Sequence, residues 1–596
     1  MNQIADRIAN FQELMKKHKI DAYIVPTADY HQSEYVGDYF KEREFLTGFT
    51  GSAGTAVVTK NSAYLWTDGR YFLQAATQLK GTGVQLMKMG EPEVPTIEEF
   101  LKAELKENEV LGFDGRTIGE QEGEQFAKIV EEKNGNIVYE YDLLGELWSN
   151  RPEMSKKPAF LLPLNYAGES VESKLTRIRK VMKEHKATMQ ILASLDDIDW
   201  MLNMRGDDVE YSPLLLSYAI VKMDEVELYV DAEKLDEELK KHLQDNHVKV
   251  YAYDSIYQRV KEISENETVM VDPRQVNYAL FNNIPKEVKV VKEENPIILM
   301  KAVKNDIEVE NIRNAHIKDG VAHTKYMYWL KKHVGKEKIT EISASDKLAA
   351  FRAEQEGYLW PSFGPISAYK EHGAIVHYSA TEETDVELRP EGLLLSDTGG
   401  NYWEGSTDIT RTIALGEVSA EEKRHFTTVA ISMLKLAETT FLYGCTGMNL
   451  DCIAREPFWR QHLNYNHGTG HGVGYLANIH EDPQRFQWKF NQDNNHPLEE
   501  HMVITDEPGL YIEGSHGVRI ENELLVKKDV SNEYGQFMKF EILTFVPIDL
   551  DAIDATIMTT EEKELLNAYH KDVYSIVSPY LNDEEKEWLK LYTREV

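Results

Sequence analysis

Two stretches of the chain carry the same pattern of apolar and polar residues. In each stretch, apolar side chains recur every three or four positions, which predicts an amphipathic helix with one buried face. The apolar positions are Ile4, Ile8, Phe11 and Met15 in the first stretch, and Val171, Leu175, Ile178 and Met182 in the second. This match indicates an internal repeat.

The elements that follow the two helices also match. A His-Lys pair comes next in both stretches, at residues 18–19 and 185–186, and a short apolar run typical of a buried strand follows it. A later strand ends at an aspartate in each copy, Asp68 in the first and Asp231 in the second. Two amphipathic helices can match by chance, but the added matches favour a duplicated unit of helix, strand, hairpin, strand and helix.

Breaks in these patterns divide the chain into three parts. The prolines at the breaks are Pro152, Pro158, Pro285 and Pro296. Asn305, with Glu308 three residues later, predicts a capping box and the start of a new helix. We therefore expect three domains, over residues 1–153, 154–303 and 304–596, the last with a C-terminal helical extension. The expected fold class is α/β (α+β).

The composition excludes some classes of protein. The chain has 596 residues, and its 66 Lys+Arg against 101 Asp+Glu give a formal charge of −35, which argues against nucleic acid and anionic membranes as partners. Its two cysteines cannot form a disulfide framework. The first residues lack the apolar region of a signal peptide, and no apolar run approaches the roughly 18 residues that span a bilayer. We expect a cytoplasmic protein without a nucleic-acid or membrane partner.

Four clusters in the third segment contain candidate chemical groups. In the first cluster, Asp397 and Asp408 flank a Gly-Gly-Asn sequence that favours a turn, so a hairpin would carry one carboxylate on each strand. Facing side chains on adjacent strands lie about 5 Å apart, which is close enough to share an ion. Turn chemistry alone also explains an isolated pair of aspartates, and that interpretation is preferred for this cluster by itself.

The second cluster is a glycine-rich segment with histidines at positions 467 and 471. Histidines four residues apart suggest a helical metal site, but glycines at every second position from 468 to 474 make a helix implausible. Such glycines let the backbone approach a ligand closely. A single histidine is more often structural than a metal ligand, and this alternative stays open.

The third and fourth clusters contain Glu507 and Glu521, each beside a predicted strand and near a turn. Taken singly, each is best interpreted as a solvated surface acid. Four carboxylates and one imidazole in a single cavity, however, would carry about four negative charges and would need cations. Two divalent ions would balance that charge, and a mostly oxygen donor set suits Mn²⁺, with Zn²⁺, Co²⁺ or Fe²⁺ as alternatives. Because two such ions lower the pKa of a bridging water, the residues alone predict a metal-dependent hydrolase.

At these clusters the chain resembles the pita-bread metallopeptidases, which include methionine aminopeptidase, prolidase, creatinase and aminopeptidase P. The family's five ligands fall, in chain order, on Asp397, Asp408, His471, Glu507 and Glu521. The resemblance implies that Asp397 chelates one metal and that His471 completes the coordination of the second. It implies that Asp408 and Glu521 bridge both metals. Glu507 is expected to bind metal and to assist proton transfer from the attacking water.

Over essentially the whole chain, the sequence is similar to the three-domain, cytosolic-type aminopeptidase P family (Xaa-Pro aminopeptidases). The further matching segments are residues 31–72, 192–206 and 374–378. The resemblance implies two creatinase-like N-terminal domains followed by a pita-bread catalytic domain. It also implies that His377, His467 and His480 lie near the substrate, where they bind the scissile peptide or move protons.

The matching motifs contain further charged residues. Glu34 and Arg70 lie in motifs that reach toward the active-site mouth in this family, although a surface ion pair is the simpler interpretation. Arg519 is expected to orient a ligand carboxylate. His501 stands where the family usually has a glycine, and Asp506 where it usually has asparagine.

The resemblance implies hydrolysis of the bond between an N-terminal residue and a following proline, through a hydroxide that bridges two metals. The expected partners are peptides with N-terminal Xaa-Pro, and the family suggests a homodimer formed through the C-terminal domain. One alternative is a prolidase, which cleaves only Xaa-Pro dipeptides and which the extra domain disfavours. A second alternative is a catalytically inactive pita-bread module that binds peptides or proteins, and the retention of all five ligands disfavours it.

Overall fold

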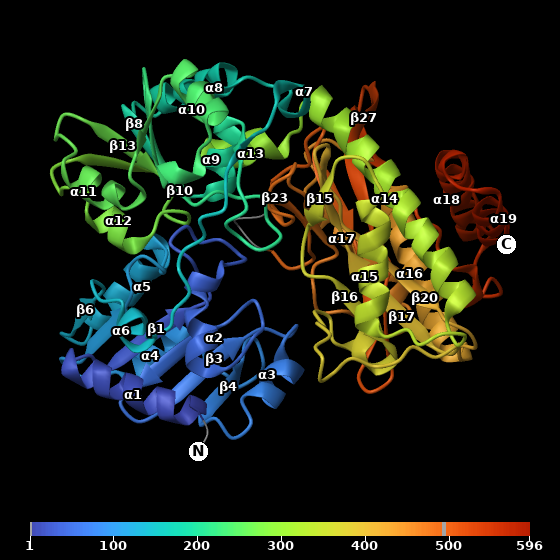
Figure 1. Cartoon of the computed structure of the whole chain (residues 1–596), viewed down its shortest axis with the longest axis horizontal. Coiled ribbons are helices and arrows are strands. Elements are labelled where there is room, and N and C mark those ends of the chain that lie inside the picture. Colours follow the sequence, from blue (N-terminus) through green and yellow to red (C-terminus); the bar gives the residue numbers. More distant parts are fainter. Residues whose placement is uncertain (1–2, 491–495) are drawn as a thin grey trace. The chain divides into compact units, whose positions relative to one another are not determined.

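The computed structural model describes residues 3–490 and 496–596, and Figure 1 shows its elements along the chain. Contacts separate the chain into two compact units. The N-terminal unit is Met1–Pro163 with Glu169–Ile297, and the C-terminal unit is Leu164–Gly168 with Ile298–Val596. The three-domain division with boundaries at residues 153 and 303 stays a prediction.

The first predicted copy folds around a six-stranded sheet. Its strands are β1 (Ala22–Pro26), β2 (Thr55–Thr59), β3 (Ala63–Thr67), β4 (Val84–Lys88), β5 (Val110–Phe113) and β6 (Asn136–Val138). Its helices are α1 (Gln3–Lys17), α2 (Glu42–Thr47), α3 (Phe72–Gln78), α4 (Ile97–Glu104), α5 (Glu120–Glu131) and α6 (Leu143–Leu147). The strand order is β4-β3-β2-β1-β5-β6, and α1 buries Ile8, Phe11 and Met15, as its pattern predicts.

The second copy repeats this arrangement. Its sheet contains β8 (Met189–Leu192), β10 (Ser217–Lys222), β11 (Val226–Val230), β12 (Val248–Tyr251), β13 (Thr268–Val271) and β14 (Lys289–Lys292). Its helices are α8 (Val171–Glu184), α9 (Leu195–Leu202), α10 (Glu237–Asp245), α11 (Ile256–Lys261) and α12 (Tyr278–Asn282), and β7 (Phe160–Leu161) pairs with β9 (Met204–Arg205). The strand order β12-β11-β10-β8-β13-β14 matches that of the first sheet position by position, which confirms the predicted duplication.

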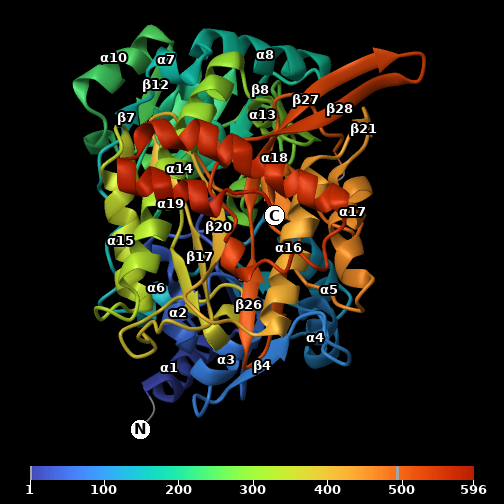
Figure 2. The same cartoon turned by 90° about the vertical axis from the view of Figure 1, so that its right-hand side faces the viewer.

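The C-terminal unit begins its main helical layer at the predicted capping box. The Asn305 side chain accepts from the backbone N–H groups of Ile307 and Glu308, and the Glu308 carboxylate accepts from the Asn305 N–H. The helices are α7 (Leu164–Ala167), α14 (Asp306–His333), α15 (Glu341–Ala353), α16 (Ala420–Ala437), α17 (Gly447–Trp459), α18 (Thr560–Val577) and α19 (Asp583–Tyr592). Helix α13 (Pro296–Ala302) contains the boundary between the two units. Figure 2 shows the predicted C-terminal helices, α18 and α19, which both pack on α14.

Four sheets, counted over residues 298–490 and 496–596, build the rest of the C-terminal unit. The three-stranded sheets are β16 (Ile366–Tyr369), β17 (Leu393–Thr398) and β20 (Ile409–Ala414), and β15 (Tyr358–Pro361), β18 (Gly400–Tyr402) and β19 (Gly405–Ser406). The six-stranded sheet, in spatial order, is β21 (Phe441–Leu442), β28 (Gly535–Ile542), β27 (Asn522–Asn532), β24 (Val503–Asp506), β22 (Gly470–Gly472) and β23 (Glu481–Phe486). Strands β25 (Gly509–Ile512) and β26 (His516–Arg519) form a separate pair. No helix in residues 3–490 and 496–596 is both long and apolar enough to cross a membrane.

The predicted hairpin around Asp397 and Asp408 is correct in its strand pairing but wrong in its turn. Strand β17 pairs antiparallel with β20, and Asp397 faces Thr410, while Asp408 lies just before β20. The predicted Gly-Gly-Asn turn is instead extended chain that leads into and forms β18. The glycines serve close packing there, because a Cβ at Gly399 would overlap the Thr407 carbonyl oxygen.

His501 adopts a left-handed backbone conformation with φ of 72°, at the turn before β24. A side chain with a Cβ pays a steric cost in this region, whereas glycine does not. This explains why a glycine is usual at this position in the family that the sequence resembles.

We expect His501→Gly to be more stable than His501→Ala by about 1 kcal/mol, because only alanine keeps the strained Cβ. Both variants lose the contact between His501 Nδ1 and the Lys304 carbonyl oxygen (3.1 Å), so that loss cancels in the comparison. Thermal melting of the two purified variants provides the measurement. Equal melting temperatures, or a higher one for the alanine variant, would contradict this explanation.

Candidate metal centre

Three acidic residues that are distant in the sequence meet in the C-terminal unit. One carboxylate oxygen from each of Asp397, Asp408 and Glu521 lies within 4.8 Å of the other two. Asp397 is on β17, Asp408 precedes β20, and Glu521 lies between β26 and β27. All three residues are buried. Their carboxylates are therefore close enough to share a cation.

A second group shares Glu521 and adds a histidine. Ligand atoms of His471, Glu507 and Glu521 also lie within 4.8 Å of one another. His471 is the central residue of β22, and Glu507 directly follows β24. The structure thus brings together all five residues that the sequence singled out as metal ligands.

Hydrogen bonding sets the orientation and tautomer of His471. Its Nδ1 lies 2.9 Å from the Gly472 carbonyl oxygen. Because a carbonyl oxygen only accepts, Nδ1 carries the proton and Nε2 presents its lone pair. Nε2 lies 3.5 Å from Asp408 Oδ2 and 3.7 Å from Glu507 Oε1. Two donor atoms that each bind one Zn²⁺-sized ion at about 2.1 Å are separated by about 3.0–3.4 Å, so these spacings approach those of a shared ion.

The glycines of the His467–Gly474 segment allow this packing. A Cβ at Gly470 would overlap the Thr505 carbonyl oxygen, and a Cβ at Gly472 would overlap the Glu481 carbonyl oxygen. Strand β22 therefore fits between β23 and β24 only because these positions lack side chains. The prediction that the segment is not helical is confirmed.

Burial and mutual repulsion raise the pKa values of these acids. Burial, then repulsion from Asp397 and Glu507, raises the pKa of the Asp408 carboxyl well above its usual range. Burial, followed by the charge of Glu521, does the same to the pKa of Glu507. The pKa of Glu521 is raised by burial and by Asp408. Such a group of acids holds its charge only if cations join it.

The residues present fit divalent cations. Asp397 Oδ1 is buried and has no hydrogen-bond partner, whereas its Oδ2 accepts from Arg519 Nη2 at 2.6 Å. An orphaned carboxylate oxygen beside other carboxylates is a natural ligand for a hard or borderline cation. Arg519 contacts the Asp397 carboxylate, as the sequence predicted, and its Nη1 donates to the Tyr511 hydroxyl at 2.7 Å.

A further layer of hydrogen bonds supports two of the acids. Thr410 Oγ1 donates to Glu521 Oε2 at 2.7 Å. The backbone N–H of Asp408 donates to Glu523 Oε1 at 2.7 Å, and that oxygen also lies 3.1 Å from His316 Nε2. Sequence reasoning assigned no role to Glu523 or His316. Glu523 is close to Glu521 in the sequence, but an isolated histidine in the long helix α14 gives no signal that it supports this site.

The three histidines predicted to bind substrate lie in different surroundings. The rings of His480 and His471 are 4.3 Å apart, and His480 can share an ion with Asp408 and His471. His467 Nδ1 lies 2.6 Å from the Gly468 carbonyl oxygen, so Nδ1 carries the proton and Nε2 accepts from the Tyr511 hydroxyl at 2.9 Å. His377 is half-buried, and the carbonyl of the preceding residue lies 3.4 Å from Arg519 Nη2.

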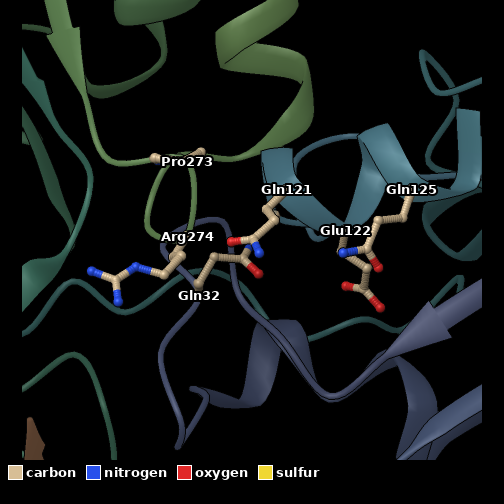
Figure 3. A pocket seen from close by; sticks show the side chains of 7 residues that line it. Gln32, Gln121, Glu122, Gln125, Pro273 and Arg274 are labelled. Atoms are coloured by element: carbon tan, nitrogen blue, oxygen red, sulfur yellow. The ribbon is translucent and has the colours of Figure 1, made fainter. Parts of the chain in front are cut away.

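Pockets are present in the described part of the N-terminal unit. A polar pocket of about 280 Å³ is lined by Gln32, Gln121, Glu122 and neighbouring residues (Figure 3), and burial raises the pKa of the Glu122 carboxyl to about 7. A second pocket of about 180 Å³ includes Glu34. Arg70 forms a two-bond ion pair with Asp68, at 2.8 Å for each bond, which agrees with the simpler interpretation of this arginine.

Comparison with known proteins agrees with this architecture. A family model described as a creatinase/prolidase N-terminal domain matches residues 7–137, and a second model of the same description matches residues 150–308. The model for metallopeptidase family M24 matches residues 310–528, and that for the C-terminal region of this family matches residues 536–596. The prediction of two creatinase-like domains followed by a catalytic domain is confirmed.

Individual relatives match along the whole chain. Aminopeptidase P1 of Arabidopsis thaliana is 36% identical and covers 100% of this chain and 99% of its own. The crystal structure of a Caenorhabditis elegans X-prolyl aminopeptidase, described as a cytosolic enzyme with a di-nuclear active site, is 32% identical, has a TM-score of 0.96 and covers 100% of both chains. A Bacillus anthracis Xaa-Pro dipeptidase, at 23% identity and a TM-score of 0.51, covers 64% of this chain and shares the fold. The chain belongs to the aminopeptidase P family of M24 metallopeptidases.

Proposed function

We propose that this chain is a metal-dependent aminopeptidase that releases the N-terminal residue from peptides with proline at the second position. The observation that carries the proposal is the full-length match to the Caenorhabditis X-prolyl aminopeptidase, together with the cluster of one imidazole and four carboxylates, of which only Glu507 is partly exposed. A shared fold alone does not specify a reaction, so the cluster is needed to supply the chemistry. The cytosolic description of that enzyme supports a cytoplasmic location here.

Two divalent cations complete the proposed site. Their ligands would be Asp397, Asp408, His471, Glu507 and Glu521. The di-nuclear active site described for the Caenorhabditis enzyme supports this number, and the mostly oxygen donor set favours Mn²⁺ over Zn²⁺, Co²⁺ or Fe²⁺. When bound, the cations would lower the pKa of the attacking water and polarise the scissile carbonyl.

We assign the proton transfer to Glu507. Its carboxylate is in the cluster, and its backbone N–H donates to the Thr469 carbonyl at 2.8 Å, which holds the residue beside β22. Glu507 accepts a proton from the attacking water and passes it to the prolyl nitrogen as the peptide bond breaks. The hydroxyl group stays on the carbonyl carbon, so one water is consumed for each bond cleaved.

The remaining predicted residues would hold the substrate. We assign His377, His467 and His480 to the peptide around the scissile bond, with His377 and His480 also able to move protons. Arg519 keeps the Asp397 carboxylate aligned through its 2.6 Å hydrogen bond. The Tyr511 hydroxyl accepts from Arg519 and donates to His467. One chain of hydrogen bonds therefore joins the carboxylate cluster to the proposed peptide-binding histidine.

A homodimer through the C-terminal unit is part of the proposal. Trp459 and Trp488 have 41% and 46% of their surface exposed, and their ring centroids are 6.4 Å apart. Neighbouring Phe490 is 66% exposed. A patch of exposed aromatic side chains is typical of a surface that binds another protein.

The substrate preference tests the proposed reaction. We expect turnover of Xaa-Pro-Xaa tripeptides and longer peptides, with release of free Xaa and no cleavage when alanine replaces the second-position proline. Chromatographic analysis of the products gives the answer. Activity restricted to Xaa-Pro dipeptides would favour a prolidase and overturn the proposal.

Metal binding has a readout that does not depend on activity. Because the folded-state pKa values of Asp408, Glu507 and Glu521 are raised, the metal-free protein is more stable when these groups are protonated and loses that stability as the pH rises through the raised values. Mn²⁺ should therefore raise the melting temperature of chelator-treated protein more at high pH, where these carboxyls have lost their protons, than at low pH, where protons compete with the metal. At a free concentration of 100 times Kd, the gain is about 2.7 kcal/mol.

Two variants that each remove one charge provide the comparison for this measurement. Asp408→Asn should lose most of the metal-induced shift, whereas Asp346→Asn, at an exposed position on α15, should keep it. If Mn²⁺ does not change the melting temperature of the wild type, an inactive binding module is favoured instead.

The oligomeric state tests the proposed interface. Light scattering coupled to size-exclusion chromatography should give a dimer for the wild type and a monomer for Trp459→Glu/Trp488→Glu, because charges in an apolar interface are costly. Tyr580→Glu replaces another exposed aromatic residue and should leave the dimer intact. A monomeric wild type would contradict this part of the proposal.

A further inference from the structure

One arginine of α17 forms hydrogen bonds with the loop that precedes β22. Arg455 Nη1 donates to the Tyr465 carbonyl and Nη2 to the His467 carbonyl, each at 2.8 Å. Its Nε donates to Asp451 Oδ2 at 2.6 Å, and the two charged side chains are only 1% and 0% exposed. Because a guanidinium is rigid and planar, it sets the spacing of the two carbonyl oxygens that it binds.

The second carboxylate oxygen of Asp451 reaches the same loop. Thr469 Oγ1 lies 2.5 Å from Asp451 Oδ1 and 2.5 Å from the Tyr465 hydroxyl. A carboxylate accepts, so the Thr469 hydroxyl donates to Asp451 and accepts from Tyr465. One ion pair on α17 therefore binds three alternate residues of the loop, at positions 465, 467 and 469.

This loop contacts Glu507 and also carries His467, so it bears on two of the residues in the proposed function. The Thr469 carbonyl accepts from the backbone N–H of Glu507 at 2.8 Å. His467, whose carbonyl is bound by Arg455, receives the Tyr511 hydroxyl on its ring. A movement of the loop would therefore displace both the proton-transfer residue and a peptide-binding histidine.

The ion pair is needed to fix this loop because the loop backbone has large conformational freedom. Glycines at positions 468 and 470 flank Thr469, and glycine has the largest conformational freedom of any residue. Catalytic geometry tolerates about 0.5 Å, and a displacement of about 1 Å can cost roughly 100-fold in rate. A buried ion pair is weak evidence for stability by itself, so a role in positioning is the stronger reason for its presence.

We propose that Asp451 and Arg455 are positioning residues for the reaction, which act through Thr469 on Glu507 and through the His467 backbone on the peptide-binding imidazole. This inference rests on the proposed function. A purely structural role would lower stability alone, whereas a positioning role lowers kcat while the protein stays folded and loaded with metal.

The test uses a matched pair of substitutions at Thr469 in the full-length metal-loaded protein. Thr469→Val removes the hydroxyl that Asp451 accepts but keeps the shape, and Thr469→Ser keeps the hydroxyl. With an Xaa-Pro-Xaa substrate, we expect Thr469→Val to lose about 10- to 100-fold in kcat, with KM within about 3-fold of wild type. Thr469→Ser should recover most of the rate, and both variants should keep the metal content of the wild type.

A second buried threonine in the same unit controls for loss of stability. Thr427 on α16 is 0% exposed, donates to the Lys423 carbonyl and accepts from the Asp554 backbone. Thr427→Val should lower the melting temperature without lowering kcat. If Thr469→Val does not fold, Asp451→Asn takes its place, because it leaves an acceptor for Thr469 but removes the charge that holds Arg455.

The outcomes separate the two proposals. A wild type that does not cleave Xaa-Pro-Xaa peptides would overturn the proposed function and this inference with it. A wild type that cleaves them, together with a folded Thr469→Val or Asp451→Asn variant of unchanged kcat, would overturn the positioning role alone. Equal losses of kcat in Thr469→Val and Thr469→Ser would also contradict it, because the hydroxyl would then not matter.

Discussion

Repulsion among buried carboxylates is the constraint on which the C-terminal unit depends. Asp408, Glu507 and Glu521 each raise the pKa of another member of the group, and burial raises all three. Protons or cations must therefore join the cluster when the protein folds. Arg519 supplies a positive charge to Asp397. Two divalent cations supply the rest in the proposed function, so folding of the site and binding of metal are linked.

The arrangement of strands makes this cluster possible. The carboxylates lie on β17, just after β24 and β26, and just before β20, and the imidazole lies on β22. Backbones approach so closely at Gly399 and Gly470 that any side chain would overlap a carbonyl oxygen. Hydrogen bonds to the Glu523 carboxylate, and from Arg519 and Arg455, hold the segments that carry the ligands in place. The precision of the site thus comes from residues that do not themselves belong to the cluster.

The sequence predicted those features that depend on local pattern. The duplicated helices and the capping box at Asn305 follow from side-chain spacing, and both are present. The strands expected to end at Asp68 and Asp231 are also present, and each ends one residue before its aspartate. The turn was misplaced because Gly399 and Gly400 were interpreted by their turn preference, whereas close strand packing explains them. His316 and Arg455 could not be found in this way. Each acts on a segment that only the tertiary fold brings near, and a lone buried histidine or helical ion pair has no distinctive pattern.

In the proposed function, this chain cleaves Xaa-Pro peptides with two metal ions held by its carboxylate cluster. Elemental analysis of the purified protein, coupled to an activity assay before and after chelation, tests it most directly. We expect about two divalent ions per chain, loss of Xaa-Pro-Xaa cleavage when they are removed and recovery when they are returned. Full cleavage by a protein without bound metal would contradict it.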